Sequence, residues 1–289
     1  MKKRVSFAAV FACLLGAMCL ALVGCAGSNQ TAGSNDAASG ASTDAQGASA
    51  YQLTEAGTLI GVSDMAYPPL ESIPEGKTDP EGFEIDMMAE VAKRLGLQMK
   101  WLDPMKFDTI IPLIKQGGKA DVGVSAFTIT AERKEEIDFT NSYLDSNQAV
   151  VLKKDSAKKG ADTSATQANL NASGIKVAVQ AGTTGEEWVR ENLPTATCVP
   201  LDDAIQALTG LTAGTYDAVV ADLPVMSYLC TNSYTDCEVA IEIPTGEQYG
   251  IVVSKQNTQL TKDINEALAA MATDGTMAKL QQKWFGAAL

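Results

Sequence analysis

Short β-branched runs alternate with amphipathic helical patterns along most of the chain, and this alternation limits the architectures open to it. In order, the expected segments are strand 58–62, helix 84–95, strand 97–101, helix 107–116, strand 120–125, strand 175–180, helix 185–192, helix 204–213 and strand 217–221. Alternating strands and helices predict an α/β architecture with open, mostly parallel sheets.

Two further stretches complete the body of the chain. Residues 153–173 are polar without strong periodicity, so we expect a surface excursion there rather than a domain boundary. Residues 260–284 carry an apolar stripe that predicts helices, and Asp274-Gly275 predicts the break between them.

The N-terminus has the pattern of a bacterial lipoprotein signal. Basic residues at positions 2–4 precede an apolar run over 5–23, and the sequence Leu-Val-Gly-Cys ends at Cys25. A charged start, an apolar stretch and a small residue at the cut are typical of a secretory signal. With cysteine at the junction, the tetrapeptide reads as a lipobox. It predicts a signal peptide over 1–24 and lipidation, with palmitate, at Cys25. A transmembrane anchor is the alternative, because the run is almost long enough to span a bilayer.

Residues 25–50 are expected to be the lipidated cysteine and a flexible linker. After Cys25 they contain only Ala, Gly, Ser, Asn, Gln, Thr and Asp. Such a segment buries too little apolar surface to offset the entropy of ordering it. We therefore expect an extracytoplasmic protein, anchored to the cell membrane by its lipid, whose fold begins near residue 51.

Charge and the absence of histidine exclude several functions. Removal of residues 1–24 takes away three basic residues and leaves 19 Lys+Arg against 35 Asp+Glu, a net charge near −16. This charge argues against nucleic-acid binding and against electrostatic adhesion to an anionic membrane. Without histidine, Ser-His-Asp and Cys-His catalysis and His-based zinc sites are excluded.

The three cysteines of the body, Cys198, Cys230 and Cys237, fit no metal-binding spacing, so no metal site is expected. Two interpretations of Cys230 and Cys237 stay open. Outside the cytoplasm they could form a disulfide across a short loop, with Cys198 as the odd thiol, or both could be free.

Six motifs stand in a defined order between residues 82 and 286. They are Gly82-Phe-Glu-Ile-Asp-Met-Met88, Ser125-Ala-Phe-Thr-Ile-Thr-Ala-Glu-Arg133 continuing to Ile137-Asp-Phe-Thr140, Val177-Ala-Val-Gln-Ala-Gly-Thr-Thr184, Tyr216-Asp-Ala-Val-Val-Ala-Asp222, Gln248-Tyr-Gly250, and Asp274-Gly-Thr276 with Lys283-Trp-Phe-Gly286. Together they resemble the family 3 extracellular solute-binding proteins, the amino-acid receptors of ABC importers, over nearly all of 53–289.

The resemblance implies a two-lobed α/β fold of the type II periplasmic-binding-protein kind, with two hinge crossings and the ligand in the interlobe cleft. Transferred here, lobe 1 comprises 51–145 plus 250–289, and lobe 2 comprises 148–245, with the hinge near 143–147 and 245–249. It also implies a monomer without a cofactor that captures a free amino acid, expected to be polar, by lobe closure. The ligand would pass to a membrane permease and its ATPase.

The chemistry of a zwitterion site can be read on the matched motifs. A zwitterion taken out of water needs an opposite charge and hydrogen bonds at both ends. The guanidinium fork of Arg133 would pair with the α-carboxylate, together with Thr128 and the helix start at Thr184. Asp222 would hold the ammonium group.

Five further residues complete the predicted site. In this family aromatic residues sandwich the aliphatic part of the ligand, and Tyr67 and Phe107 occupy those positions. Asp64 would face the ligand side chain, which favours a polar or cationic substrate. Ser125 and Gln180 lie at the carboxyl ends of expected strands, where open α/β sheets bind ligands. Glutamine, other polar amino acids, cationic amino acids and cystine all stay open as substrates.

The site residues have structural alternatives. Arg133 lies in a charged run that alone predicts a solvated helix face, and either Thr128 or Thr130 could cap that helix. Asp222 could cap the helix that follows it. The two aromatic residues could simply belong to the core.

Two functions of other classes stay open. A dehydratase on the same fold would need an acid or base over the reacting carbon, for which Asp222 or Glu247 are candidates. A ligand-sensing module would need a separate membrane receptor, because no output segment follows residue 289. We expect binding rather than catalysis, and no catalytic residue.

Overall fold

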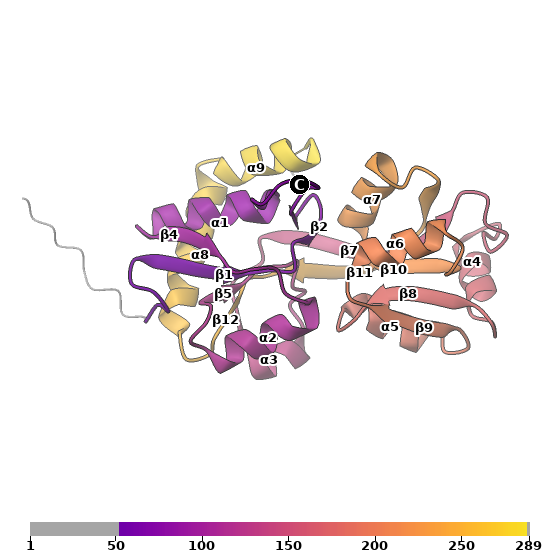
Figure 1. Cartoon of the computed structure of the whole chain (residues 1–289), viewed down its shortest axis with the longest axis horizontal. Helices are drawn as coiled ribbons and strands as arrows, with labels where there is room; N and C mark the ends of the chain where they lie inside the picture. Colours follow the sequence, from indigo (N-terminus) through magenta and orange to yellow (C-terminus); the bar gives the residue numbers. More distant parts are fainter. Residues whose placement is uncertain (1–51, 288–289) are drawn as a thin grey trace, which may run out of the picture. The chain divides into compact units, whose positions relative to one another are not determined.

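The computed structural model describes residues 52–287, whose strands form two five-stranded sheets and one two-stranded sheet (Figure 1). These residues belong to one unit, Ala48–Leu289. The predicted signal peptide over 1–24, the lipidation at Cys25 and the linker up to residue 50 lie outside the described residues.

The first sheet has the strand order β4-β1-β5-β12-β6. Its strands are β1 (Thr58–Val62), β4 (Gln98–Trp101), β5 (Val122–Gly123), β6 (Asp138–Phe139) and β12 (Val252–Val253). Strand β1 pairs in parallel with β4 and β5, and β12 pairs antiparallel with β5 and β6. The elements around it are the hairpin β2 (Ala66–Tyr67) and β3 (Glu71–Ser72), and the helices α1 (Phe83–Arg94), α2 (Phe107–Gln116), α3 (Ala131–Glu136), α8 (Thr258–Thr273) and α9 (Thr276–Phe285).

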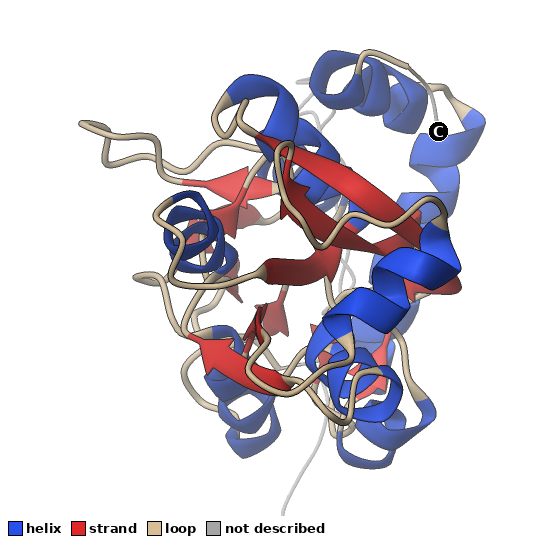
Figure 2. Cartoon of the chain, turned by 90° about the vertical axis from the view of Figure 1, so that its right-hand side faces the viewer, coloured by secondary structure: helices blue, strands red, loops and turns tan. Residues whose placement is uncertain are grey.

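The second sheet has the strand order β11-β7-β10-β8-β9. Its strands are β7 (Leu144–Lys153), β8 (Lys176–Gln180), β9 (Thr197–Leu201), β10 (Ala218–Asp222) and β11 (Cys237–Tyr249). Its helices are α4 (Thr163–Leu170), α5 (Thr184–Asn192), α6 (Ala204–Thr212) and α7 (Leu223–Asn232). Strand β8 pairs in parallel with β9 and β10, and the helices pack around the strands (Figure 2). The α/β prediction is therefore confirmed.

Strands β7 and β11, which we call the crossing strands, carry the chain between the two sheets. They pair antiparallel from Leu144–Tyr249 to Lys153–Cys237. The pairing register shifts between Ile243 and Glu247. The chain leaves the first sheet after β6 and returns to it at β12, so both connections run side by side.

The bounds predicted from local sequence patterns agree closely with the observed helices and strands. Strand β1 and helix α2 have the predicted bounds, and α8 and α9 are separated at Asp274-Gly275. The predicted strand over 120–125 is paired only at Val122–Gly123. At Gly123 an added Cβ would lie 2.5 Å from Val252 and 2.8 Å from Ile110, so glycine allows α2 and β12 to pack closely.

The polar stretch over 153–173 contains a helix that periodicity did not predict. Helix α4 begins at the cap residue Asp162, whose side chain accepts a hydrogen bond from the Ala165 amide at 2.8 Å. Only Thr166 and Leu170 of this helix are buried. Two buried positions are too few to produce a helical hydrophobic period in the sequence. The local sign of this helix is its N-cap residue, Asp162.

No helix within residues 52–287 is both long enough and apolar enough to cross a membrane.

Candidate ligand-binding cleft

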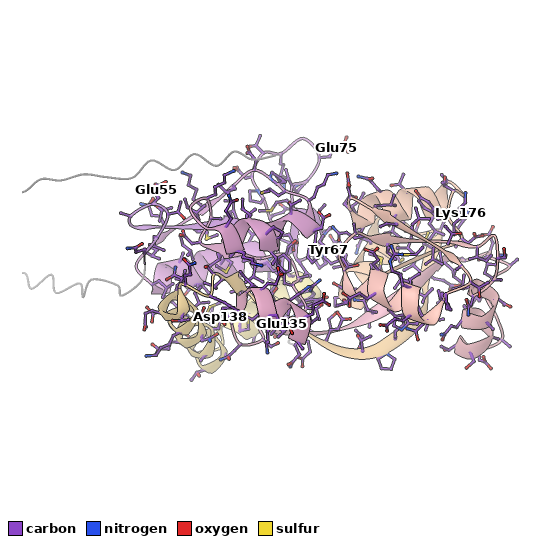
Figure 3. The ribbon with its side chains drawn as sticks, turned by 90° about the horizontal axis from the view of Figure 1, so that it is seen from below. Glu55, Tyr67, Glu75, Glu135, Asp138 and Lys176 are labelled. Carbon is purple, nitrogen blue, oxygen red and sulfur yellow. The ribbon has the colours of Figure 1, made fainter. Side chains whose placement is uncertain are left out.

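The nine residues predicted to bind ligand surround one cavity between the two sheets. The first sheet and its loops contribute Asp64, Tyr67, Phe107, Ser125, Thr128 and Arg133, and the second contributes Gln180, Thr184 and Asp222. Ala126 and Thr183 complete the lining. Tyr67 lies at the junction between the two parts (Figure 3). The cavity measures about 10 Å³, which is room for about one water molecule. An amino acid is larger, so its entry requires the two parts to separate.

Arg133 reaches both walls of the cleft from helix α3. Thr130 caps this helix by accepting the Arg133 amide at 3.1 Å, so the cap is Thr130 and not Thr128. The Arg133 guanidinium donates to the Thr128 carbonyl at 2.9 Å and to the Gly182 carbonyl, across the cleft, at 2.9 Å. Burial lowers the pKa of Arg133, while the charges of Glu187 and other acids oppose that change. An arginine remains cationic under these conditions.

Two phenylalanines provide an aromatic surface beside the guanidinium. Phe107, at the start of α2, stacks on Phe127 with ring centroids 4.6 Å apart. The Cζ atom of Arg133 lies 5.5 Å from the Phe107 centroid and 5.9 Å from that of Phe127. Both rings are buried, so they restrict the guanidinium to the cleft and favour it there through cation–π attraction.

Asp222 ends strand β10 and is buried in the cleft wall. It stands at the N-cap position of α7, but its side chain makes no cap hydrogen bond. Its carboxylate instead accepts from the side-chain amide of Gln148, and its backbone amide donates to the Tyr67 hydroxyl at 3.1 Å. Burial, followed by the nearby charge of Glu247, raises the pKa of Asp222 to about 7. The Asp222 carboxylate therefore does not cap helix α7, which was the structural alternative to a ligand-binding role.

Asp64 and Gln180 meet across the cleft. The Gln180 amide donates to Asp64 Oδ2 at 2.7 Å, and Asp64 Oδ1 accepts the Ala66 amide at 3.0 Å. Burial raises the pKa of Asp64. These contacts place an amide and a carboxyl group together in the cavity wall, where a polar side chain of a ligand would find both a donor and an acceptor.

A buried carboxyl pair, Glu71 on β3 and Glu84 on α1, supports the loop after β5. Ser125 donates to Glu71 at 2.6 Å, and the Ala126 amide donates to Glu84 at 2.9 Å. Tyr143 also donates to Glu84. Ala126 has a φ of 49°, an uncommon conformation that these bonds hold in place. Burial raises the pKa of both acids, and for Glu71 the charge of Glu84 is the second cause. The pair therefore resists carrying two negative charges.

Sequence reasoning did not place Gln148 in the site, and it considered Glu247 only as a possible catalytic acid. Gln148 lies on β7, and its amide donates to Asp222, to Thr184 Oγ1 at 3.2 Å and to Glu247 Oε2 at 3.1 Å. In the sequence, a glutamine directly before the apolar run Ala149–Leu152 is a signal that could have identified Gln148, which the structure shows to be fully buried. Nothing in the local sequence around Glu247 gives such a signal.

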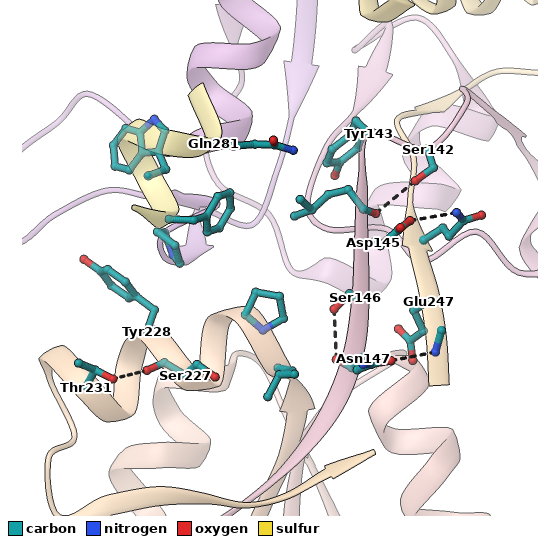
Figure 4. A pocket seen from close by; sticks show the side chains of 18 of the residues that line it. Ser142, Tyr143, Asp145, Ser146, Asn147, Ser227, Tyr228, Thr231, Glu247 and Gln281 are labelled. Atoms are coloured by element: carbon teal, nitrogen blue, oxygen red, sulfur yellow. Dashed lines mark hydrogen bonds between the residues drawn. The ribbon is translucent and has the colours of Figure 1, made fainter. Parts of the chain in front are cut away.

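A second, larger cavity of about 1060 Å³ lies beside the crossing strands, between α7 and α9 (Figure 4). Its walls include Tyr228, Trp284 and Phe285, together with Glu247. It contains none of the nine predicted residues.

The cysteines are free thiols in this structure. Cys198 and Cys230 are partly exposed and Cys237 is buried, so a bridge between Cys230 and Cys237 is not formed. The Cys237 sulfur lies 3.8 Å from the Thr212 hydroxyl and 3.7 Å from an Asp236 oxygen. Of the two interpretations of this pair, the structure has the free thiols. Within residues 52–287, no group of acids and cysteines is placed to hold a metal ion.

Comparison with known proteins identifies the family. The family of bacterial extracellular solute-binding proteins, family 3, matches residues 59–287. The L-cystine-binding protein TcyJ of Escherichia coli strain K12 is 32% identical over 238 residues, covering 82% of this chain and 85% of that protein. The ABC transporter arginine-binding protein 1 of the same strain is 32% identical over 232 residues, covering 78% and 89%.

A solved structure extends the similarity to the fold. The ancestral amino acid-binding protein AncCDT-1, a precursor of cyclohexadienyl dehydratase, has a TM-score of 0.71 with this structure at 34% identity, covering 79% of this chain and 96% of that one. The predicted two-lobed α/β fold of the type II periplasmic-binding-protein kind is confirmed. This chain belongs to family 3 of the bacterial extracellular solute-binding proteins.

Proposed function

We propose that this protein captures a polar amino acid by closure of its two lobes and delivers it to the permease of an ABC importer. One observation carries the proposal: a cation, Arg133, and a buried carboxyl group, Asp222, line the same closable cavity from opposite parts of the fold. An amino acid carries the matching pair of charges. The similar cystine-binding and arginine-binding proteins support an amino acid as the solute.

Each end of the zwitterion has a partner in this arrangement. The α-carboxylate would pair with Arg133 and with the amides at the start of α5, where backbone N–H groups favour an anion. The ammonium would pair with Asp222. The ligand side chain would extend between Tyr67 and Phe107 toward Asp64 and Gln180. These last two groups favour a polar or cationic side chain.

We propose lobe boundaries at 51–145 plus 250–289 and at 148–245, with the hinge in the crossing strands. Support comes from the division of the strands into two sheets that share no ladder. Several bonds would break on opening, among them Arg133 to Gly182 and Gln180 to Asp64. A ligand favours the closed state only through the contacts that it makes better there.

The setting of the protein is also part of the proposal. The sequence around Cys25 supports a lipid anchor and an extracytoplasmic location, and we propose a monomer without a cofactor. No enzymatic activity is proposed, because the similar proteins with assigned names are transport receptors. A dehydratase would release a changed product, so recovery of the ligand unchanged separates the two functions. A sensor would bind without uptake, which a transport assay in cells separates.

The test is a melting-temperature screen of the purified protein, stripped of ligand by partial unfolding and refolding, against the twenty amino acids and cystine. Ligand at about 100 times its dissociation constant adds roughly 2.7 kcal/mol of stability, which should raise the midpoint by about 5–10 °C for a body of this size. Arg133→Ala should abolish the shift. Arg190→Ala is the matched control, because Arg190 pairs with Glu186 on the exposed face of α5. No shift with any of these compounds would remove amino-acid capture as the function.

A further inference from the structure

Three donors converge on one oxygen of Glu247. The Thr128 hydroxyl donates to Glu247 Oε2 at 2.7 Å, and the Thr184 hydroxyl donates to the same atom at 3.0 Å. The Gln148 amide adds a third bond at 3.1 Å. Thr128 lies between β5 and α3 on the side of the first sheet, Thr184 begins α5 on the side of the second, and Gln148 and Glu247 lie on the two crossing strands. A single carboxylate oxygen therefore occupies the meeting point of both parts of the fold.

Two of these donors, Thr128 and Thr184, are residues that the sequence motifs assign to the α-carboxylate of the ligand. A hydroxyl group has one proton to donate. In this arrangement the protons of Thr128 and Thr184 are both directed at Glu247, so an incoming α-carboxylate would need the same protons. The negative charge of Glu247 also acts on Arg133, since it is among the charges that raise the pKa of this arginine. Glu247 thus shares both the hydroxyls and the electrostatic field of the carboxylate site.

The side chain of Glu247 also has space into which it can move. It follows the register shift of β11 at Ile243–Glu247, where the ladder is interrupted. It is only partly buried, and it lines the cavity of about 1060 Å³ on the side of α7 and α9. Figure 4 shows Glu247 at this wall, beside Asn147 of the other crossing strand.

We propose that Glu247 is an internal competitor for the carboxylate site: its side chain occupies the hydroxyl donors of Thr128 and Thr184 and turns away when the α-carboxylate of an amino acid enters. This inference rests on the proposed function. Glu247 is then a residue that sets affinity, because binding must displace one anion to admit another. Ligands without an α-carboxylate do not compete for these hydroxyls, so Glu247 affects them less.

The experiment compares the wild type with Glu247→Gln, which keeps the size of the side chain and removes its charge. Melting shifts with the twenty amino acids and cystine select the amino acid with the largest effect. Calorimetric titration then gives its dissociation constant and that of its α-carboxamide. We expect Glu247→Gln to bind the amino acid roughly tenfold more tightly, because a charge-assisted bond no longer has to be broken. The gain for the carboxamide should be threefold or less.

Two further variants control the interpretation. Glu247→Ala should also bind more tightly, which excludes a new contact made by glutamine. Glu242→Gln is the matched control, because Glu242 lies on the same strand and accepts from Asn147 at 3.0 Å outside the cleft. It should bind like the wild type.

The outcomes separate the inference from the function beneath it. If the wild type binds an amino acid and both Glu247 variants bind it equally or more weakly, Glu247 supports the closed state instead, and the proposal is wrong while the function stands. An equal gain for the carboxamide would also overturn competition for the carboxylate site. If Glu247→Gln binds an amino acid and the wild type does not, the result would support both the amino-acid-binding function and the competition by Glu247. If neither protein responds to any of the compounds, the function fails and the inference fails with it.

Discussion

Two groups of neighbouring acids in this protein have opposite roles, and the difference lies in what donates to them. Glu71 on β3 and Glu84 on α1 lie fully buried and hold Ser125 and the Ala126 amide in place. Asp222 and Glu247 lie at the cleft. Asp222 accepts from Gln148 of its own sheet, whereas Glu247 accepts from Thr128 and Thr184, which belong to different parts of the fold. Donors that lie on one side of the cleft make a framework. Donors that separate when the lobes part make a site that a ligand can take over.

The largest expected effect is on the framework pair. Glu84→Ala removes the acceptor of the Ala126 amide and of Tyr143 in the core, which should lower the free energy of unfolding by about 3 kcal/mol. Chemical denaturation of ligand-free protein measures this loss. Glu84→Gln can keep one acceptor and should lose less. Equal stability of Glu84→Ala and the wild type would contradict the framework role.

Asp222→Asn tests the cleft group in the same way and should affect binding instead. The ammonium group of the ligand loses its charged partner, so we expect about 100-fold weaker binding of the amino acid. Stability without ligand should not fall, because the variant removes a buried ionisable group. Calorimetric titration measures the change in binding, and thermal melting measures the stability without ligand. A strongly destabilised Asp222→Asn protein would mean that this acid belongs to the framework.

The pH dependence of binding sharpens the comparison. With a pKa of about 7 in the free protein, Asp222 must release a proton before it can pair with an ammonium group. Affinity should therefore fall about tenfold for each pH unit below that value. Titrations at pH 8 and pH 5.5 measure the change, and Asp222→Asn should show little of it.

The same group makes a prediction about stability. Its pKa rises from 3.8 in the unfolded chain to about 7 on folding, so within this window the folded state binds the extra proton. The contribution of Asp222 to stability is complete below the lower value and is lost as the pH rises through the upper one. Relative to Asp222→Asn, the wild type should lose melting temperature between pH 5 and pH 8. A constant difference would contradict the raised pKa.

The smallest expected effect concerns an exposed ion pair across the cleft. Lys106 and Asp202 are 2.8 Å apart, with side chains 60% and 53% exposed. Exposed pairs contribute less than about 1 kcal/mol, so Lys106→Ala should weaken ligand binding no more than about fivefold. Lys115→Ala is the matched control, because Lys115 pairs with Glu136 within one part of the fold. A loss of tenfold or more for Lys106→Ala alone would show that closure depends on this pair.

The sequence by itself determined most of the local structure. Strand β1 and helix α2 match their predicted bounds, since periodicity and a terminal glycine at Gly117 act within a few residues. The nine residues predicted to bind ligand all line the small cavity. Six of them lie within the motifs, and the other three, Asp64, Tyr67 and Phe107, lie outside them.

The tertiary structure alone decided the contacts that connect these segments. Thr128 and Glu247 are 119 residues apart in the chain, and Gln148 and Asp222 are 74 apart. No local pattern encodes such a pairing, because it depends on how the crossing strands set the two sheets against each other. The state of Cys230 and Cys237 is also a property of the folded structure: their spacing allowed either a disulfide or two free thiols, and the structure has the free thiols. The local sequence determines which side chains a strand or helix presents. Only the assembled fold determines which of these side chains form hydrogen bonds with one another.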